Sequence, residues 1–463
     1  MTGEQIQGLR VELSRFLREF GDSFGRVEQR RKLEIYVGGQ LSELPRKSIE
    51  PIALEAGISP RNLQEFLASD DWEEERLREH TARLVRRDHS DPEAIGVIDE
   101  SGHPKKGNET AGVSPQYCGN TGKIDNCVTT VHLTFSSFDT EFRTMLESDL
   151  YLPRCWDEDR ERCRRAKVPD DVVYRPKYDI ALEQLDRARE AGVSFAWITA
   201  DEWYTEKPKF LRGLESRGLR FVLECPRNLR ARLVDPALRP DVCSKPVENL
   251  LRYSAGLMRQ SWVKYRIKDT HKGPMVWEAK SIRCWLPSGS GAVGPYWLIV
   301  ARNVLRPDEL KFFISNAGAG VPLTVLLHVA FARWPVERCL QDEKSELGLS
   351  HFEVRGYPAL KRHLLITQVS HLFLARQTAR LRGGKSGDHS STSSQGRQCA
   401  DRFATTPRCR AARRAQPCTT EIEIPPGTKQ KRSAEPHEDS APSASSPGNP
   451  ALRIAALCSR ENS

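Results

Sequence analysis

The chain of 463 residues is long enough for two to four domains, and its 38% hydrophobic content suffices for a buried core. Lysine and arginine (71) exceed aspartate and glutamate (62), and the net charge of +9 suits a polyanionic partner without reaching that of a histone-like protein. The apolar runs are too short for a membrane span, the N-terminus lacks a signal-peptide pattern, and the twelve cysteines form no CxxC pair. We therefore exclude a secreted or membrane protein and expect a cytoplasmic one with reduced thiols.

The first part of the chain, residues 1–85, is predicted to be helical. Two long helices are expected at residues 6–20 and 27–41. Residues 48–67 then have helix–turn–helix character, because Gly57 ends one helix while Ser59 and Pro60 begin the next. An ordinary α-hairpin has the same short pattern, and the sequence leaves both interpretations open.

From residue 94 onward the pattern is that of strands and helices in mixed order. Expected strands cover residues 95–98, 127–135, 142–151, 193–199 and 219–224, with a helix at 176–191. Short alternating strands follow at 262–269, 275–285, 296–303 and 311–315, and helices resume at 322–347 and 358–381. This order predicts an α/β fold with a central sheet.

The apolar periodicity stops abruptly after residue 383. Residues 383–463 are rich in serine, proline and arginine, and their apolar runs are too short to form a core. We expect a disordered tail there. A shifted reading frame would produce such an abrupt change.

Two of the expected strands end in acidic residues, Asp99 and Asp201. Ligands of open α/β sheets bind at the carboxyl ends of strands, and two aspartates there could share Mg²⁺ ions because Mg²⁺ takes hard oxygen ligands. An acidic residue after a strand is also a common turn former or helix cap, so each aspartate alone has a purely structural explanation.

A third carboxylate is expected from the helix at 322–347. At about 100° per residue, Glu337, Arg333 and Lys344 project from one narrow face of this helix. Pro335 suggests a break that would make Trp334 the start of a new segment. A solvated, salt-bridging face is the alternative interpretation.

Other basic and aromatic residues are weaker candidates for nucleic-acid contacts. Lys105 and Lys106 could hold a phosphate, although a solvated loop explains them equally well. The alternating strands carry Trp262, Trp277, Trp285 and Trp297 among Lys264, Arg266, Lys268, Lys272 and Lys280. Such interleaving can track a DNA backbone, but a half-buried sheet has the same pattern. No Walker motif is present, so no ATP is implied.

Several stretches together resemble DDE-type insertion-sequence transposases of the DDE superfamily endonuclease group. The first matching stretches are residues 95–107 and 116–127. The match continues at 151–153, 169–172, 175–177, 200–204, 333–337, 346–349 and 351–355, with similar N-terminal stretches at 24–31 and 44–53. The resemblance covers residues 15–380, and many separate motifs occur in the expected order.

This resemblance implies a definite fold and domain organisation. An RNase H-like catalytic core would comprise residues 90–225 and 317–382, interrupted by a β-rich insertion at 226–316. A helical N-terminal DNA-binding domain would occupy residues 1–85, and the tail from 383 on departs from the family. Ala330 stands where related transposases carry tyrosine, and His103 stands where an aromatic residue is more usual.

The resemblance also implies an activity. The catalytic and metal-binding triad would be Asp99, Asp201 and Glu337, holding two Mg²⁺ ions that Mn²⁺ can replace. Arg333, Lys344, Lys105 and Lys106 would contact DNA. The substrates would be double-stranded DNA with terminal inverted repeats and a target duplex, bound by a homodimer at the bacterial nucleoid. Two alternatives are a degenerate remnant that only binds DNA, and a non-transposing nuclease on the same fold.

Overall fold

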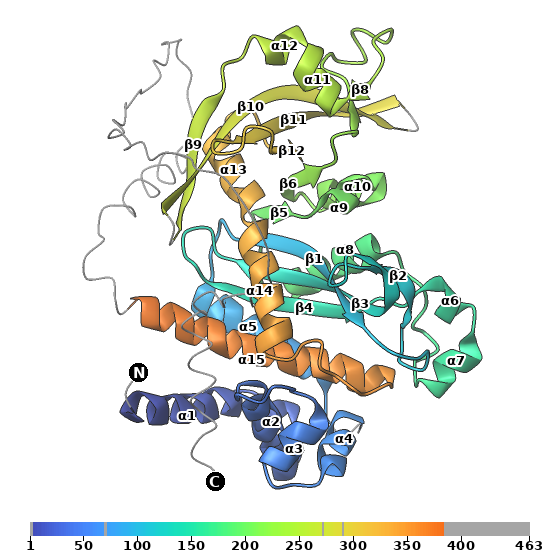
Figure 1. The fold of residues 1–463 in the computed structure, drawn as a ribbon, viewed down its shortest axis with the longest axis vertical. Helices are drawn as coiled ribbons and strands as arrows, with labels where there is room; N and C mark the ends of the chain where they lie inside the picture. The colour runs from blue at the N-terminus through green and yellow to red at the C-terminus, as the bar shows by residue number, and fades with distance from the viewer. Residues whose placement is uncertain (1–2, 69–71, 271–272, 289–290, 384–463) are drawn as a thin grey trace, which may run out of the picture. The chain divides into compact units, whose positions relative to one another are not determined.

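The computed structural model describes residues 3–68, 72–270, 273–288 and 291–383 (Figure 1). The expectation of a disordered tail falls outside these residues from position 384 on. Within the described ranges, every helix is too short or too polar to cross a lipid bilayer.

A ten-stranded mixed sheet forms the centre of the fold (Figure 1). The strands preceding residue 226 are β1 (Ile95–Pro104), β2 (Ser114–Cys118), β3 (Lys123–Ser136), β4 (Arg143–Leu150), β5 (Trp197–Thr199) and β6 (Arg220–Cys225). Those that follow in the sheet are β9 (Val263–Thr270), β10 (Gly273–Ser288), β11 (Gly291–Asn303) and β12 (Leu310–Ser315). Their order is β2-β3-β1-β5-β6-β12-β11-β10-β9, and β4 pairs with β3. The predicted α/β class is confirmed.

Only the pairs β1–β5 and β5–β6 of this sheet are parallel, and its other described pairs are antiparallel. β12 pairs with β6, so the β-rich stretch after residue 226 extends the central sheet. Between β6 and β9 lie a small two-stranded sheet, β7 (Arg230–Ala231) with β8 (Lys245–Pro246), and two helices, α11 (Val247–Tyr253) and α12 (Ala255–Met258).

Two of the tryptophans singled out in the β-rich stretch pack within the protein. Arg302 and Lys280 lie over the Trp262 ring, at 4.2 and 4.7 Å from its centroid. Trp277 is buried and lies 4.8 Å from Phe331, centroid to centroid. Trp277 therefore belongs to the interior of the fold, whereas Trp262 is half-buried against the side chains of Lys280 and Arg302.

Helices cover both faces of the sheet, and β1 shows which residues point to which side. Val97 packs in the same cluster as the apolar helix α13 (Leu323–Phe331), whereas Ile98 packs with α8 (Lys177–Glu190). Because side chains alternate along a strand, Asp99 lies on the α13 side with Val97.

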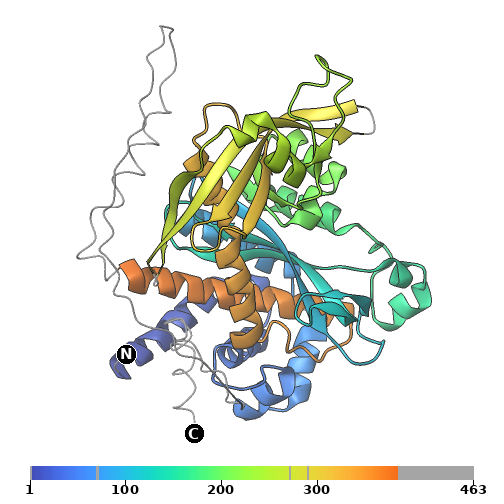
Figure 2. The same ribbon diagram turned by 45° about the horizontal axis from the view of Figure 1, so that its top comes forward.

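The helix expected at 322–347 is divided into α13 and α14 (Arg333–Glu346), which follow one another toward α15 (Tyr357–Gly383) (Figure 2). The break falls at Ala332, so the prediction that Trp334 starts the new segment is wrong by one residue. Pro335 occupies the third helical position, where its missing N–H leaves no intrahelical bond unmade. Glu337 and Arg333 therefore share one continuous helix.

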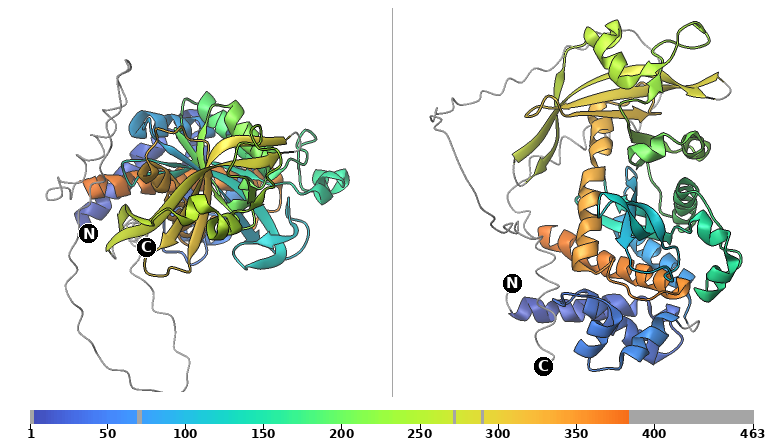
Figure 3. Two further views of the ribbon diagram at one scale, coloured as in Figure 1. Left: turned by 90° about the horizontal axis from the view of Figure 1, so that it is seen from above. Right: turned by 45° about the vertical axis from the view of Figure 1, so that its right-hand side comes forward.

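The N-terminal helices are α1 (Gly3–Arg18), α2 (Val27–Gln40), α3 (Ile49–Glu55), α4 (Pro60–Ala68) and α5 (Glu74–His89), with a short 3₁₀ helix at Gly21–Ser23. Helix α15 lies between α1–α4 and the sheet (Figure 3). Buried hydrogen bonds join α15 to α2: Gln40 donates to Thr367 Oγ1 at 2.8 Å, and Tyr36 Oη lies 2.9 Å from His363 Nδ1. Helices α2 and α3 approach so closely that a Cβ on Gly39 would lie 2.5 Å from Ile52.

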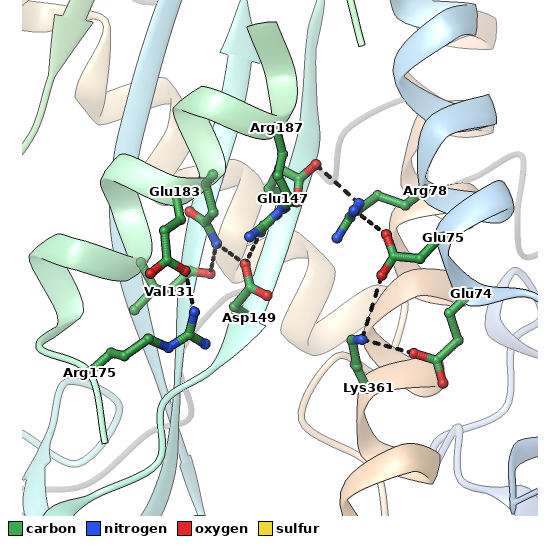
Figure 4. Close-up of polar contacts among 11 residues, drawn as sticks. Glu74, Glu75, Arg78, Val131, Glu147, Asp149, Arg175, Glu183, Arg187 and Lys361 are labelled. Atoms are coloured by element: carbon green, nitrogen blue, oxygen red, sulfur yellow. Dashed lines mark hydrogen bonds and ion pairs between the residues drawn. The ribbon is translucent and has the colours of Figure 1, made fainter. Parts of the chain in front are cut away.

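A buried polar network connects β4, α8 and α5 (Figure 4). Arg187 of α8 donates to Glu147 at 2.8 Å and also pairs with Asp149. Gln184 donates to Asp149 at 2.8 Å, and Arg78 of α5 lies 3.8 Å from Glu147. Burial raises the pKa of Glu147 to about 7 although Arg187 opposes the shift. This network ties the N-terminal region to the sheet through charges removed from water.

Candidate active site

The two aspartates singled out in the sequence occupy matching positions on neighbouring strands. β1 and β5 run parallel with Val97 opposite Thr199, and each aspartate follows two residues later. Asp99 nevertheless lies inside β1. The prediction that this strand ends at Asp99 is wrong, because antiparallel β3 continues to pair with β1 as far as Pro104.

Asp201 lies one residue beyond the end of β5 and caps the short helix α9 (Glu202–Thr205). Its Oδ1 accepts hydrogen bonds from the backbone N–H groups of Trp203 and Tyr204, at 3.0 and 3.4 Å. Burial raises the pKa of Asp201, while the charge of Arg333 opposes the shift. The capping role is therefore real, and it also fixes the carboxylate beside Asp99.

Asp99 lies in the most perturbed electrostatic environment of the candidate triad. Its Oδ1 accepts the backbone N–H of Glu100 at 2.8 Å. Burial raises the pKa of Asp99 to about 7, with the charges of Asp201 and Glu337 adding to the shift and Arg333 opposing it. A carboxyl group crowded by other acids is typical of a site that binds a cation or transfers protons.

Arg333 lies at the centre of these acids. Its guanidinium pairs with Glu337 one turn further along α14 and with Glu224 at 3.0 Å. Burial disfavours the charged guanidinium, but the surrounding carboxylates outweigh it and raise the pKa of Arg333. These carboxylates belong to Asp99, Glu337, Glu224 and Asp201. The structure thus brings together four of the residues singled out in the sequence: Asp99, Asp201, Arg333 and Glu337.

Glu224 is a component of this site that the sequence analysis did not identify. It lies next to the end of β6, the third parallel strand, and pairs with Lys311 as well as Arg333. The rule that directed attention to Asp99 and Asp201, an acid at the carboxyl end of a strand, applies equally to Glu224. That rule could have found it.

The three candidate lysines lie in different surroundings. Lys344 Nζ donates to Asn120 Oδ1 at 3.0 Å, and burial lowers the pKa of Lys344 while the charge of Asp99 opposes the shift. Lys105 Nζ donates to the carbonyls of Ser350 and Phe352, at 3.1 and 2.7 Å, in the segment between α14 and α15. Lys106 is exposed. Of the three, Lys344 is the one whose charge interacts with a candidate acid.

The two positions that depart from the family pattern are both buried. Ala330 lies in α13 and packs with the apolar cluster on that side of the sheet. His103 places its ring nitrogens 2.8 Å from Ser350 Oγ and 2.8 Å from Thr130 Oγ1. His103 therefore anchors β1 to β3 and to the segment after α14.

A buried ion pair anchors α14 to α15. Glu343 Oε1 lies 2.7 Å from His371 Nδ1. Burial disfavours the charged imidazole, but the Glu343 carboxylate outweighs this effect and raises the pKa of His371 to about 10. Helix α14, which carries Glu337 and Arg333, is thus tied to α15 through Glu343.

This pair predicts a loss of stability in alkaline solution. The stability it contributes is complete below the unfolded-state pKa of about 6.5 and is lost as the pH rises toward 10, because only the native state retains the proton. We expect the melting temperature of wild type to fall more steeply between pH 7 and 10 than that of His371→Gln. His80→Gln serves as control, because burial lowers the pKa of His80. Equal slopes in all three proteins would contradict the prediction.

The donor set suits a hard divalent cation, since Asp99, Asp201 and Glu337 offer carboxylate oxygens of the kind that Mg²⁺ prefers. Within the described ranges, however, no three acidic, histidine or cysteine side chains converge closely enough to ligate one ion. Arg333 supplies the positive charge among the acids in this arrangement. The residues therefore fit the cation in chemistry, and binding requires the side chains around Arg333 to rearrange.

Comparisons with known proteins identify related sequences. A family model described as DDE superfamily endonuclease matches residues 19–260, a segment that includes Asp99, Asp201 and Glu224 and ends before α14. A probable transposase for insertion sequence element IS701 from Microchaete diplosiphon is 27% identical over 328 residues, which is 70% of this chain and 76% of that protein.

Among solved structures, the NurA nuclease from Sulfolobus solfataricus matches 65% of this chain and 87% of its own, with 9% identity and a TM-score of 0.24. So low a score does not establish a shared fold. The family model, by contrast, spans just over half of the chain and contains two of the three candidate acids. The chain belongs to the DDE superfamily endonucleases and resembles an insertion-sequence transposase.

Proposed function

We propose that this protein is a DNA transposase that cuts strands at the ends of an insertion sequence and joins them to target DNA. The observation that carries the proposal is the matched register of Asp99 and Asp201 on parallel strands, with Arg333 and Glu337 beside them. The IS701-like relative, named as a probable transposase, supports the same conclusion.

The strand order supports an RNase H-like core for this enzyme. Strands β4, β3 and β1 are antiparallel neighbours, and β1, β5 and β6 continue the sheet in parallel. Both aspartates thereby come to the same edge of the core, and α14 brings Glu337 from a distant part of the sequence. The β-rich stretch that separates β6 from α13 is the insertion of this architecture.

Asp99, Asp201 and Glu337 would hold two Mg²⁺ ions, or Mn²⁺ in their place. Such cations activate the attacking hydroxyl and stabilise the leaving oxygen of a phosphodiester. Arg333 and Lys344 would add positive charge for the phosphates on either side of the cut, and exposed Lys106 would contact the backbone further away. The protein would act as a dimer on the two ends of the element, at the bacterial nucleoid.

An assay on duplex DNA that carries the terminal inverted repeats tests this function. We expect Mg²⁺-dependent cleavage at the repeat end, followed by joining of the cut 3′ end to a second duplex. Cleavage without joining would instead assign a non-transposing nuclease. Binding without cleavage would assign a degenerate remnant.

The N-terminal region would recognise the element ends through α4. Helices α3 and α4 are joined through Gly57, whose φ of 65° suits the turn between them. Helix α4 buries Leu63, Phe66 and Leu67 and exposes Arg61, Asn62, Gln64 and Glu65. Arginine, asparagine and glutamine are the residue types that read bases in a major groove.

We predict that combining Asn62→Ala with Gln64→Ala lowers the preference for repeat DNA over unrelated DNA about thirtyfold or more, since each good base contact contributes about 1–3 kcal/mol. The slope of affinity against salt should not change, because it reports phosphate contacts. Gel-shift titrations against both duplexes measure the two quantities. The control is Glu55→Ala, because Glu55 is an exposed residue of the neighbouring helix α3. An equal loss on both duplexes would remove α4 from base recognition.

A further inference from the structure

Glu224 is held more firmly than a surface acid. Its backbone N–H donates to the carbonyl of Ala200 at 3.2 Å, and its own carbonyl accepts from Thr205 Oγ1 at 2.6 Å. These two bonds fix Glu224 to the segment that carries Asp201. The side chain is 11% exposed, and Lys311 of β12 pairs with its Oε1.

The other Glu224 oxygen, Oε2, accepts Arg333 Nη2 at 3.0 Å, while Nη1 of the same guanidinium pairs with Glu337. A planar guanidinium with five N–H donors can bind two carboxylates at once. The two acids differ in conformational freedom, because the Glu337 side chain is 44% exposed and the Glu224 side chain is only 11% exposed. Glu337 can therefore turn away from Arg333 while Glu224 retains it.

Arg333 has the charge and position to compete with a divalent cation for the same carboxylates. Without Glu224, the Arg333 guanidinium would pair only with Glu337 and the two aspartates. Each cation entering the site would then have to displace Arg333 from these carboxylates. A fixed second acid removes part of that competition.

We propose that Glu224 is a positioning residue that retains Arg333 and so leaves Glu337 free to take up a divalent cation. The inference rests on the proposed function, since it assumes that Asp99, Asp201 and Glu337 bind such an ion. Glu224 acts through Arg333 and not as a ligand itself.

The test is a double-mutant cycle read by Mn²⁺ binding, with free Mn²⁺ measured by electron paramagnetic resonance on the full chain without DNA. We expect Glu224→Gln to weaken Mn²⁺ affinity about tenfold, the equivalent of one lost charged hydrogen bond. In an Arg333→Gln background the same substitution should change affinity less than about twofold, because its target is gone.

The matched control is Glu278→Gln. Glu278 is also a largely buried acid of the sheet, and it pairs with Arg302 at 2.9 Å, so it should leave Mn²⁺ affinity unchanged. Should the single Glu224→Gln variant fail to fold, Arg333→Gln alone and the double variant still provide the decisive comparison. A tenfold loss between those two proteins would show that Glu224 acts directly, and would overturn the proposal.

The outcomes also separate this inference from the proposed function. Wild-type protein that binds no Mn²⁺ would overturn both. Mn²⁺ binding that is lost in Asp99→Asn but unchanged in Glu224→Gln would keep the proposed metal site and overturn the role of Glu224 alone.

Discussion

Asp99→Asn, Asp201→Asn and Glu337→Gln are each expected to lower the rate of DNA-end cleavage by about three orders of magnitude or more, equivalent to about 4 kcal/mol in the barrier. Each amide preserves the shape of the side chain but loses the negative charge that a divalent cation requires. Binding of repeat DNA should stay largely intact. Cleavage of an end-labelled duplex with Mg²⁺ and gel-shift titration of the same duplex measure the two effects.

Glu346→Gln is the matched control for Glu337, because Glu346 lies on the same helix but on a different face. The Glu346→Gln variant should cleave DNA at the wild-type rate. If one of the three variants still cleaves DNA, the residue substituted in it does not belong to the triad. A variant that loses DNA binding together with cleavage would indicate damage to the fold and not to the chemistry.

Arg187→Ala should destabilise the protein by about 3–5 kcal/mol, because it leaves Glu147 and Asp149 inside the protein without their main cation. The Glu147 side chain is only 3% exposed, so water cannot replace the guanidinium. Arg175→Ala is the control (Figure 4): its pair with Glu183 is more than one third exposed and should contribute about 0–1 kcal/mol. Thermal melting of both variants provides the comparison.

The Arg187→Ala defect should also depend on pH. The folded-state pKa of Glu147 is about 7, above its unfolded value, so the native state binds an extra proton between those values and loses stability as the pH rises through them. The defect should therefore be smaller at pH 5.5 than at pH 8. Adding Glu147→Gln should recover part of the loss at pH 8. A defect of equal size at both pH values would show that the titration of Glu147 does not contribute to it.

The sequence predicted the site residues that depend on local pattern and missed those that depend on pairing between distant segments. The strands before Asp99 and Asp201 were recognisable from short apolar runs, and β1 begins at Ile95 as expected. Of the strand expected at 193–199, only Trp197–Thr199 forms β5. The continuation of β1 to Pro104 could not be predicted from such a run, because it is stabilised by pairing with β3, which comes about twenty residues later in the chain.

Helix periodicity placed Glu337 and Arg333 on one face correctly, since their ion pair depends only on the spacing within α14. It gave no sign that Arg333 also binds Glu224, because that contact joins residues that are far apart in sequence. Lys105 shows the same limit. Its partners, the carbonyls of Ser350 and Phe352, are backbone atoms that carry no signature in the sequence.

The position of α14 in the chain also has a consequence for synthesis. The ribosome makes both aspartates and the whole β-rich stretch before it reaches Arg333 and Glu337. At about 5–20 residues per second, the interval between Asp201 and Glu337 lasts on the order of ten seconds. Throughout that interval the nascent chain lacks both Arg333 and Glu337, so the candidate site can assemble only after the β-rich stretch has been made.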